Sequence, residues 1–239
     1  MGFVGASGAG MTVAYERGIE GLLAANPGKI DWVASCTAPY GTASWAVEIG
    51  KLKQCDFIIN CLFGSMLSSF TRDARYRGYE GSIITGMEGY PAFWDLVTAA
   101  LPPDELYSLY FAFWQPWWNE SVPFIVDLKE RVQQYFPDEY DYLTSQPGPI
   151  TGWSVGLVLG GAIRRAVDEV GVEGLNSDAI RDALLQTDMQ MVDQGWGNNW
   201  KFEPDYRVLW KKQRVFNWEM ADQEWTAITD WFLPASVPD

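Results

Sequence analysis

The stretch Phe3-Val4-Gly5-Ala6-Ser7-Gly8-Ala9-Gly10-Met11-Thr12 decides how this chain folds. It begins as a short apolar strand, passes through three glycines and continues into a pattern with helical spacing. Glycine lets the backbone turn at φ angles closed to other residues and lets a ligand or a neighbouring segment come close. A strand that enters a helix through such a turn opens a parallel α/β sheet, whose ligands lie beyond the carboxyl ends of its strands. We therefore expect this turn to face whatever the protein binds.

The same strand-and-helix unit recurs through the first half of the chain. Apolar runs predict further strands at 30–34, 56–60, 82–85 and 106–113. Helical spacing or breaker residues predict the intervening helices at 11–25, 43–53, from about 65 to 77, and 91–99. Four β–α repeats and a closing strand predict a doubly wound sheet with its strand-to-helix turns at one edge.

The second half of the chain has a different pattern. Helices are predicted at 121–135, 152–170 and 176–186, the last with Asn176 or Ser177 as its N-cap, and strands at 202–210 and 214–219, followed by a final strand or short helix at 225–232. Segment 119–190 thus has amphipathic helices but no strand of its own. Such helices gain most of their stability by burying an apolar face. We expect the faces around Phe124, Leu128, Leu157 and Ile163 to need a sheet from a segment upstream of Met1 or from a partner chain.

Composition excludes several classes of function. The 239 residues carry a net charge of −14, which argues against nucleic acid or anionic lipid as a partner. There is no histidine, so histidine triads and histidine metal sites are excluded. No apolar run reaches the ~18 residues of a membrane span, and no signal peptide precedes the first strand.

The three cysteines, Cys36, Cys55 and Cys61, lack metal-site spacing. In a 2-1-3 strand order the first strand separates Cys36 from Cys61 by two strand spacings, ~9.5 Å, which exceeds the ~7 Å limit for a disulfide. Cys55 lies at the opposite end of the third strand. We predict three free thiols.

The Gly5–Thr12 turn nearly matches a phosphate loop, with Thr12 where a magnesium-binding hydroxyl would stand. Met11 occupies the lysine position, however, so nothing neutralises the terminal phosphates. The second strand also ends in Val33-Ala34-Ser35, without the acid that binds a ribose in dinucleotide sites. If this turn did bind a nucleotide, the protein would be a nucleotide-dependent α/β enzyme, which is the alternative function. If it does not, the glycines serve only to let the helix pack against the strand.

Glu88 stands between glycines after a parallel strand, where a carboxylate is well placed to receive an ammonium group; the alternative is a solvated loop acid. Phe63, Tyr90 and Trp117 lie on turns and are predicted to line a cleft, where aromatic faces can hold apolar groups or a cation. The other aromatic residues nearby are predicted to be core.

At this point the chain resembles the substrate-binding proteins of ABC importers, in particular the leucine/isoleucine/valine-type receptors and their amide- and urea-binding relatives. The resemblance rests on the order and spacing of several weak motifs: Gly41-Thr42-Ala43, Lys53 to Ile59, Arg72 to Gly78, Ile84 to Gly89, Gly152-Trp153-Ser154 to Ala166, and Val215 to Trp218. It implies a type I periplasmic-binding (Venus flytrap) fold: a doubly wound parallel-sheet lobe and an incomplete second lobe. Residues 1–116 with 212–239 would form the ligand-binding lobe 2 and residues 117–211 the helical part of lobe 1, with about 120 residues of the family pattern, on the order of one lobe, absent upstream.

The resemblance also implies a function. The protein would deliver an amino acid or related small amide or short peptide to an ABC transporter membrane permease by hinge closure, without catalysis, cofactor or metal; a sensor or structural protein on the same fold is a further alternative. It would lie in the periplasm or outside the cell, with a lipid anchor on an upstream N-terminus as a further expectation. Glu88 matches the acid that receives the ligand's α-ammonium group, and Phe63 falls at or beside the aromatic residue of the third-strand turn. Ala9 and Gly10 replace the aromatic residue of the first turn, which leaves room for a larger ligand. The expected ligand-binding residues are Ser7, Ala9, Gly10, Leu62, Phe63, Glu88, Tyr90 and Trp117.

Overall fold

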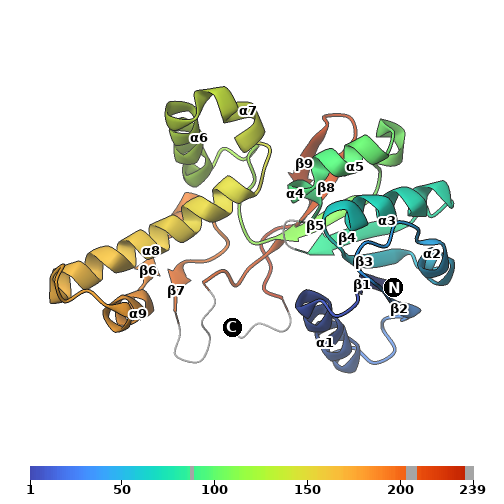
Figure 1. Ribbon diagram of the computed structural model, residues 1–239, viewed down its shortest axis with the longest axis horizontal. Coiled ribbons are helices and arrows are strands. Elements are labelled where there is room, and N and C mark those ends of the chain that lie inside the picture. Colours follow the sequence, from blue (N-terminus) through green and yellow to red (C-terminus); the bar gives the residue numbers. More distant parts are fainter. Residues whose placement is uncertain (87–88, 203–208, 235–239) are drawn as a thin grey trace. The chain divides into compact units, whose positions relative to one another are not determined.

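The computed structural model describes residues 1–86, 89–202 and 209–234. The chain divides into two compact units (Figure 1). The first unit contains residues 1–113 and 214–230, and the second contains residues 114–213 and 231–233.

The first unit is built on a seven-stranded sheet with the order β2-β1-β3-β4-β5-β8-β9. The first five strands in this order are parallel, as predicted, and the last two add an antiparallel hairpin at one edge. The strands are β1 (Gly2–Ala6), β2 (Ala34–Ala38), β3 (Phe57–Cys61), β4 (Ser82–Gly86), β5 (Leu109–Phe113), β8 (Arg214–Glu219) and β9 (Glu224–Ala227).

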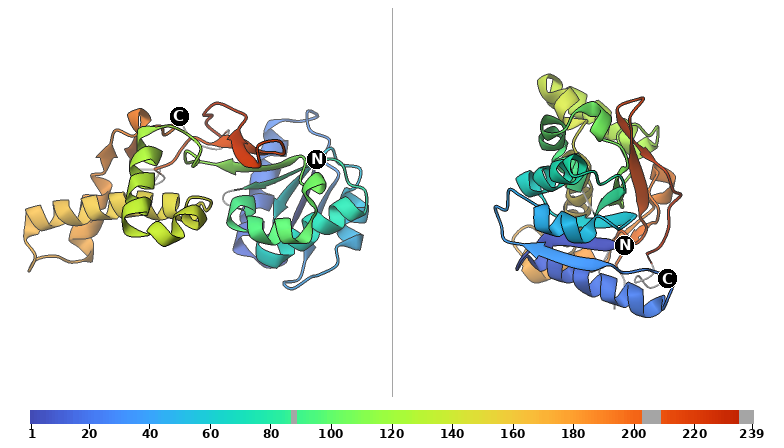
Figure 2. Two further views of the ribbon diagram at one scale, coloured as in Figure 1. Left: turned by 90° about the horizontal axis from the view of Figure 1, so that it is seen from above. Right: turned by 90° about the vertical axis from the view of Figure 1, so that its right-hand side faces the viewer.

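The helices of this unit cover both faces of the sheet (Figures 1 and 2). They are α1 (Gly10–Ala25), α2 (Ala46–Leu52), α3 (Gly64–Tyr76), the single turn α4 (Gly89–Ala92) and α5 (Trp94–Ala100). The connection from β1 to β2 runs toward one edge of the sheet, and the later connections run the other way. Because such crossovers are right-handed, α1 lies on one face while α2, α3 and α5 share the other. This is the predicted doubly wound arrangement.

The second strand does not lie where the apolar run 30–34 predicts it. The observed strand is Ala34–Ala38, in which the buried Cys36 and Ala38 alternate with the exposed Ser35 and Thr37. This alternation is typical of an edge strand with one face in solvent, whereas an apolar run suits a central strand. Trp32 of the predicted run packs instead on the cluster formed by Phe3 and Ile19.

The three thiols are free and buried, as predicted. Cys36 is paired in register with Val4, and Cys61 with Gly5, so β1 lies between the two cysteines.

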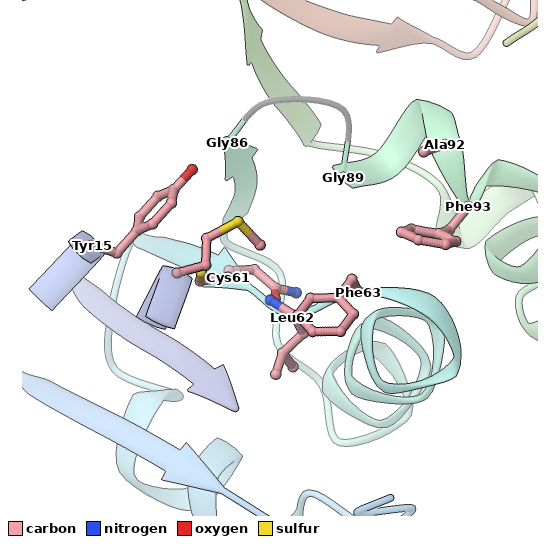
Figure 3. Close-up of a pocket in the computed structure, with 10 residues that line it drawn as sticks. Tyr15, Cys61, Leu62, Phe63, Gly86, Gly89, Ala92 and Phe93 are labelled. Atoms are coloured by element: carbon pink, nitrogen blue, oxygen red, sulfur yellow. The ribbon is translucent and has the colours of Figure 1, made fainter. Parts of the chain in front are cut away.

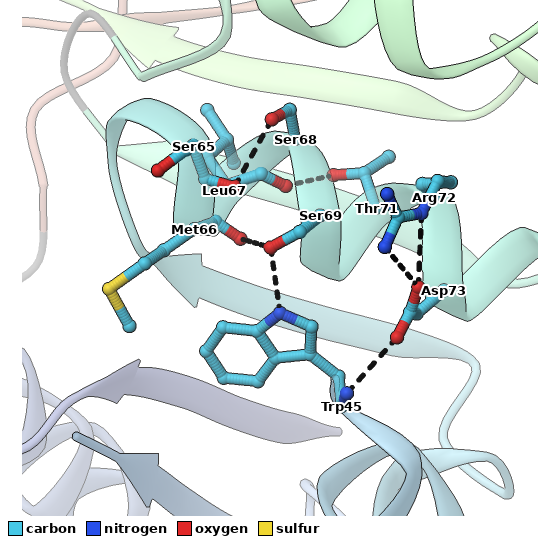
Figure 4. A network of polar contacts seen from close by, with 9 residues as sticks. All are labelled: Trp45, Ser65, Met66, Leu67, Ser68, Ser69, Thr71, Arg72 and Asp73. Carbon is cyan, nitrogen blue, oxygen red and sulfur yellow. Dashed lines mark hydrogen bonds and ion pairs between the residues drawn. The ribbon is translucent and has the colours of Figure 1, made fainter. Parts of the chain in front are cut away.

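A polar network joins α2 to α3 (Figure 4). The backbone N–H of Trp45, the residue before α2, donates to Asp73 Oδ2 at 3.1 Å, and the Trp45 indole donates to Ser69 Oγ at 2.9 Å. The N-cap residue of this helix makes no side-chain capping hydrogen bond, and its backbone N–H donates instead to a carboxylate from α3.

Arg75 of α3 joins two loops by hydrogen bonds from the protein interior. Its side chain is only 4% exposed, and its guanidinium donates to the backbone carbonyls of Tyr79, Gly81, Glu105 and Tyr107. The Tyr107 ring lies 4.1 Å from the guanidinium carbon. The segments before β4 and β5 are thus fixed by one buried cation.

The second unit is mainly helical. It contains α6 (Pro123–Tyr135), α7 (Tyr140–Leu143), α8 (Gly148–Val170), α9 (Ser177–Leu185) and the two-residue strands β6 (Asp188–Met189) and β7 (Trp200–Lys201). Asn176 caps α9 by accepting from the backbone N–H groups of Asp178 and Ala179, both at 3.0 Å, as predicted. β6 corrects the expectation that 119–190 has no strand, and most of the strand predicted at 202–210 lies outside the described residues.

The apolar helix faces differ from the expectation for this unit. Phe124 and Leu128 of α6 are already buried, and the Phe124 ring packs edge-on against Trp196. On α8, Val155, Leu159 and Ile163 are 46%, 43% and 37% exposed and form an apolar stripe at i, i+4 spacing.

Candidate functional site

A cavity of about 190 Å³ opens in the first unit where β3 and β4 end (Figure 3). Its lining comes from α1, the ends of β3 and β4, the turn before α3, and α4: Met11, Tyr15, Asn60, Cys61, Leu62, Phe63, Gly86, Gly89, Ala92 and Phe93. This is the edge at which open α/β sheets bind ligands. A cavity of this size has room for a small solute.

Tyr15 forms the wall of the cavity on the side of α1. It lies one helical turn after Met11, so both side chains project from the same face of the helix. Figure 3 shows its hydroxyl directed to Gly86, where a Cβ atom would lie only 1.3 Å from that oxygen. Glycine at the end of β4 is therefore what allows Tyr15 to occupy this position. Burial raises the pKa of Tyr15 to about 12, and its hydroxyl makes no hydrogen bond within the described part of the chain.

Asn60 is the buried polar group of the lining. Its side chain is 1% exposed, and Oδ1 accepts from the Leu62 backbone N–H at 2.9 Å. Its Nδ2 has no hydrogen-bond partner among the described residues. Burial raises the pKa of Tyr90, whereas the Thr71 hydroxyl at 3.1 Å and the nearby Asn60 amide act to lower it.

Cys61 contributes a neutral thiol to the lining. Burial raises its pKa to about 11, an effect that the Thr12 hydroxyl opposes and the Glu16 carboxylate reinforces. A thiol rather than a thiolate is a poor nucleophile and a weak metal ligand. None of the described lining residues is a lysine or an arginine, the side chains that usually bind a phosphate.

The glycine-rich turn after β1 has a packing role. Thr12 is 2% exposed and lies against Gly5, where a Cβ atom would meet its Oγ1 at 2.7 Å. Gly8 adopts a φ of +74°, which favours glycine. Because Thr12 is buried between helix and strand, its hydroxyl is not presented to a magnesium ion. The geometry favours the packing interpretation of this turn over the nucleotide-binding one.

Only two of the eight ligand-binding residues predicted from the sequence are among the described residues that line this cavity. Leu62 and Phe63 line the cavity. Ser7, Ala9 and Gly10 lie on the first turn and outside this lining. The remaining three, Glu88, Tyr90 and Trp117, are not among the described lining residues.

Tyr90 is fully buried, its ring stacked on Trp225 at 6.3 Å and edge-on to Trp94. Trp117 belongs to the second unit, where it is 5% exposed and its backbone N–H donates to Glu120 Oε1 at 2.6 Å. Glu88 lies outside the described residues.

Sequence reasoning missed Met11, Tyr15, Asn60 and Phe93 as lining residues. The i, i+4 spacing of Met11 and Tyr15 at the start of the first helix would have indicated a shared face. Asn60 carries a weaker signal, a polar residue within an otherwise apolar strand. Phe93 gave none, because an aromatic residue in a helix is usually core.

Within residues 1–86, 89–202 and 209–234, no cluster of three or more cysteine, aspartate or glutamate side chains could hold a metal ion. No helix within these ranges combines the length and apolarity that a bilayer crossing requires.

No protein-family model and no curated protein sequence matches the chain. Solved structures do. A branched-chain amino acid ABC transporter protein from Thermus thermophilus with bound valine matches with a TM-score of 0.75 and 14% identity, over 98% of this chain and 61% of that one. A substrate-binding periplasmic protein from Ralstonia solanacearum matches with a TM-score of 0.72 and 17% identity, over 95% of this chain and 60% of that one. A fatty acid ABC transporter substrate-binding protein from Thermomonospora curvata matches with a TM-score of 0.75 and 14% identity, over 98% of this chain and 57% of that one.

The chain therefore spans about 60% of the length of the structures it matches. At these identities the likeness concerns the fold, and it covers nearly the whole of this chain. Together with the doubly wound sheet and the cavity at its strand ends, it identifies the architecture: the chain has the type I periplasmic-binding fold of ABC transporter substrate-binding proteins.

Proposed function

We propose that this chain is the ligand-binding part of an extracytoplasmic solute-binding protein that delivers an amino acid, a small amide or a short peptide to an ABC importer. The observation that carries the proposal is the cavity at the carboxyl ends of β3 and β4. It is small and mostly apolar, and its lining includes two uncharged polar side chains, Tyr15 and Asn60. Sites for small ligands generally combine an apolar lining with a few polar groups.

The neighbouring structures support the same class of ligand. One was solved with bound valine, and another is described as a fatty acid transporter protein. Both descriptions indicate ligands with an apolar part, and Met11, Phe63 and Phe93 provide apolar surface in the cavity. The neighbours are binding proteins, which supports binding without catalysis.

In this proposal the two parts of the chain have different roles. Residues 1–116 with 212–239 form the lobe that contains the cavity, and residues 117–211 form the helical part of the other lobe. Closure of the lobes by a hinge would enclose the ligand, and a membrane permease would receive it outside the cytoplasm. Glu88, two positions after Gly86 in the sequence, is proposed to receive the ammonium group of an amino-acid ligand.

A thermal-shift screen followed by calorimetry tests this function. Amino acids, aliphatic amides, dipeptides and Mg·ATP would each be added to the purified protein. A ligand at 100 times its dissociation constant adds ~2.7 kcal/mol to the stability of the native state. We expect stabilisation by at least one small solute and none by Mg·ATP.

A matched pair of variants locates the binding. Phe63→Ala removes a ring that lines the cavity, whereas Phe136→Ala removes a ring that is 52% exposed in the second unit. The first variant should weaken solute binding and the second should leave it unchanged. Stabilisation by Mg·ATP alone, or equal effects of both variants, would contradict the proposed function.

A further inference from the structure

A second cavity, of about 290 Å³, lies in the first unit between α5, the loop 101–106 and the β8–β9 hairpin, which stands beside α5 in Figure 1. Leu106 precedes β5, and Trp218 lies beside the start of β5 because β8 runs antiparallel to it, with Asn217 paired to Tyr110. The cavity therefore lies toward the amino ends of the parallel strands. It shares no described lining residue with the cavity at the carboxyl ends, so a ligand here would be additional to the solute of the proposed function.

Two indole rings dominate the lining of this second cavity. The ring centroids of Trp94 on α5 and Trp218 on β8 lie 4.4 Å apart, with the ring planes at 49°, and both side chains remain partly exposed. Leu101, Leu106 and Met220 add apolar surface, and Met220 is 39% exposed. Indole is the aromatic ring that attracts a cation most strongly.

The lining offers few hydrogen bonds to a ligand. Apart from the two indole N–H groups, its described polar side chains are Thr98 and Gln223. The Thr98 hydroxyl already lies 3.1 and 3.3 Å from the backbone carbonyls of Trp94 and Asp95, to which it donates. A sugar would bring more hydroxyl groups than these few partners can pair, whereas a fully methylated ammonium group needs no hydrogen bond.

The segments around the second cavity are acidic. Segments 94–106 and 218–224 supply the whole described lining and contain neither lysine nor arginine. Their six carboxylates are those of Asp95, Asp104, Glu105, Glu219, Asp222 and Glu224. Asp95, Asp104 and Asp222 are exposed, and each is next in sequence to a lining residue. The buried Arg75 reaches only the backbone carbonyls of this region, from the interior. The local field therefore attracts a cation and repels an anion.

We propose that the second cavity binds a small solute with a methylated ammonium group, such as choline, between the indoles of Trp94 and Trp218 and the carboxylates of Asp95, Asp104 and Asp222. The methyl groups of such a cation suit the apolar lining, while its charge is attracted by the aromatic rings and by the carboxylates. A bare ammonium group suits the cavity less well, because it is strongly hydrated and would lose that hydration on entry.

The test compares choline with 3,3-dimethylbutan-1-ol, which has the same shape but carries a carbon in place of the charged nitrogen. Binding to the purified chain is measured by ligand-observed NMR at low ionic strength. We expect choline to bind about 2- to 30-fold more tightly than the alcohol, the range for a cation over an indole ring. In Trp218→Leu most of this preference should be lost. A general loosening of the cavity would weaken both probes alike.

The double variant Asp104→Asn/Asp222→Asn tests the charge without altering the rings. Both carboxylates are exposed and form no hydrogen bond or ion pair in the described part of the chain, so the fold should be unaffected. Choline binding should weaken about 2- to 10-fold, and binding of the alcohol should not change. The control, Asp138→Asn/Asp141→Asn, makes the same change in charge at exposed positions of the second unit and should leave both affinities unchanged.

Two further arms identify the cavity and the source of the ligand. Phe63→Ala alters the lining of the first cavity and should leave choline binding unchanged. Phosphatidylcholine vesicles carry the same head group as choline, so sedimentation with them, lost in Trp218→Leu, would assign the head group to a lipid and not to a free solute.

Equal affinity for choline and the alcohol would overturn the proposal, as would a preference for choline that survives in both Trp218→Leu and the Asp104/Asp222 variant. If choline binding is lost only in Phe63→Ala, choline is a solute of the first cavity: the second site is wrong and the proposed function stands. If Trp218→Leu does not fold, the Asp104/Asp222 variant and its control decide the question.

Discussion

Replacing Gly86 with alanine should displace Tyr15 from the cavity wall. The new Cβ atom would lie 1.3 Å from Tyr15 Oη, 2.6 Å from Cζ and 3.2 Å from Cε1. An ordinary contact needs at least 3.4 Å, so the hydroxyl must move by about 2.1 Å, the difference between 3.4 and 1.3 Å. Overpacking of this kind costs about 1–3 kcal/mol. At about 2–4 °C per kcal/mol for a chain of this size, the melting temperature should fall by roughly 2–12 °C.

The cause can be isolated by a double-mutant cycle. In a Tyr15→Leu background the three clashing atoms are absent, so Gly86→Ala should cost less than about 0.5 kcal/mol there. Thermal unfolding of the four proteins, followed by circular dichroism, gives the coupling energy. Calorimetry with whichever solute the native protein binds measures the second effect, since a displaced Tyr15 ring would move into space that the ligand uses.

Gly18→Ala is the control for this prediction. Gly18 lies within α1 and a Cβ atom there meets nothing within 4 Å, so alanine should stabilise the helix by about 0.5–1 kcal/mol. If Gly86→Ala is as stable as the native protein, or if its cost is the same with and without Tyr15, the contact between α1 and the end of β4 does not have the importance described above.

Three further predictions concern other parts of the first unit. Arg75→Met should destabilise the unit by about 3–5 kcal/mol, because four backbone carbonyls lose their charged donor. Arg77→Met, at an exposed position, should have little effect in urea titrations. Glu88→Gln should weaken binding of an amino acid by roughly 2–5 kcal/mol if that carboxylate receives the ammonium group, and an unchanged affinity in calorimetry would rule out this role. Burial raises the pKa of Cys61 from 9.0 to about 11 and that of Tyr15 from 10.0 to about 12, so the folded state favours the neutral form of both groups. Their contribution to the free energy of unfolding should therefore be full below pH 9 and should be lost as the pH rises through 11 and 12. In Cys61→Ala this loss, measured by urea titration at each pH, should be less steep.

The fold could be predicted where local pattern and burial agree. β1, β3 and β4 are apolar runs in the middle of a parallel sheet, and each is followed by a turn and a helix. β2 could not be placed correctly, because an edge strand alternates and its neighbouring apolar residues pack on a helix instead.

The site divides in the same way. Leu62 and Phe63 directly follow a predicted strand, so their position at the ligand edge can be read from sequence. Tyr15 could not be found in that way, because its place in the lining depends on the absence of a side chain at Gly86, 71 positions later in the chain. The burial of Asn60 in the cavity wall is likewise a tertiary property that sequence spacing does not reveal.

The capping of α2 by Asp73 has a consequence for how the native state opens. α2 has only seven residues, far fewer than the 12–15 that an isolated helix needs, and its first turn is held by the Asp73 carboxylate and the Ser69 hydroxyl of α3. When α3 separates, α2 loses both hydrogen-bond partners and is too short to remain helical by itself. Amide protons of α2 and α3 should therefore exchange with deuterium as one cooperative group with a common opening free energy. In Asp73→Asn, which weakens this cap, the exchange of α2 should become faster and independent of α3.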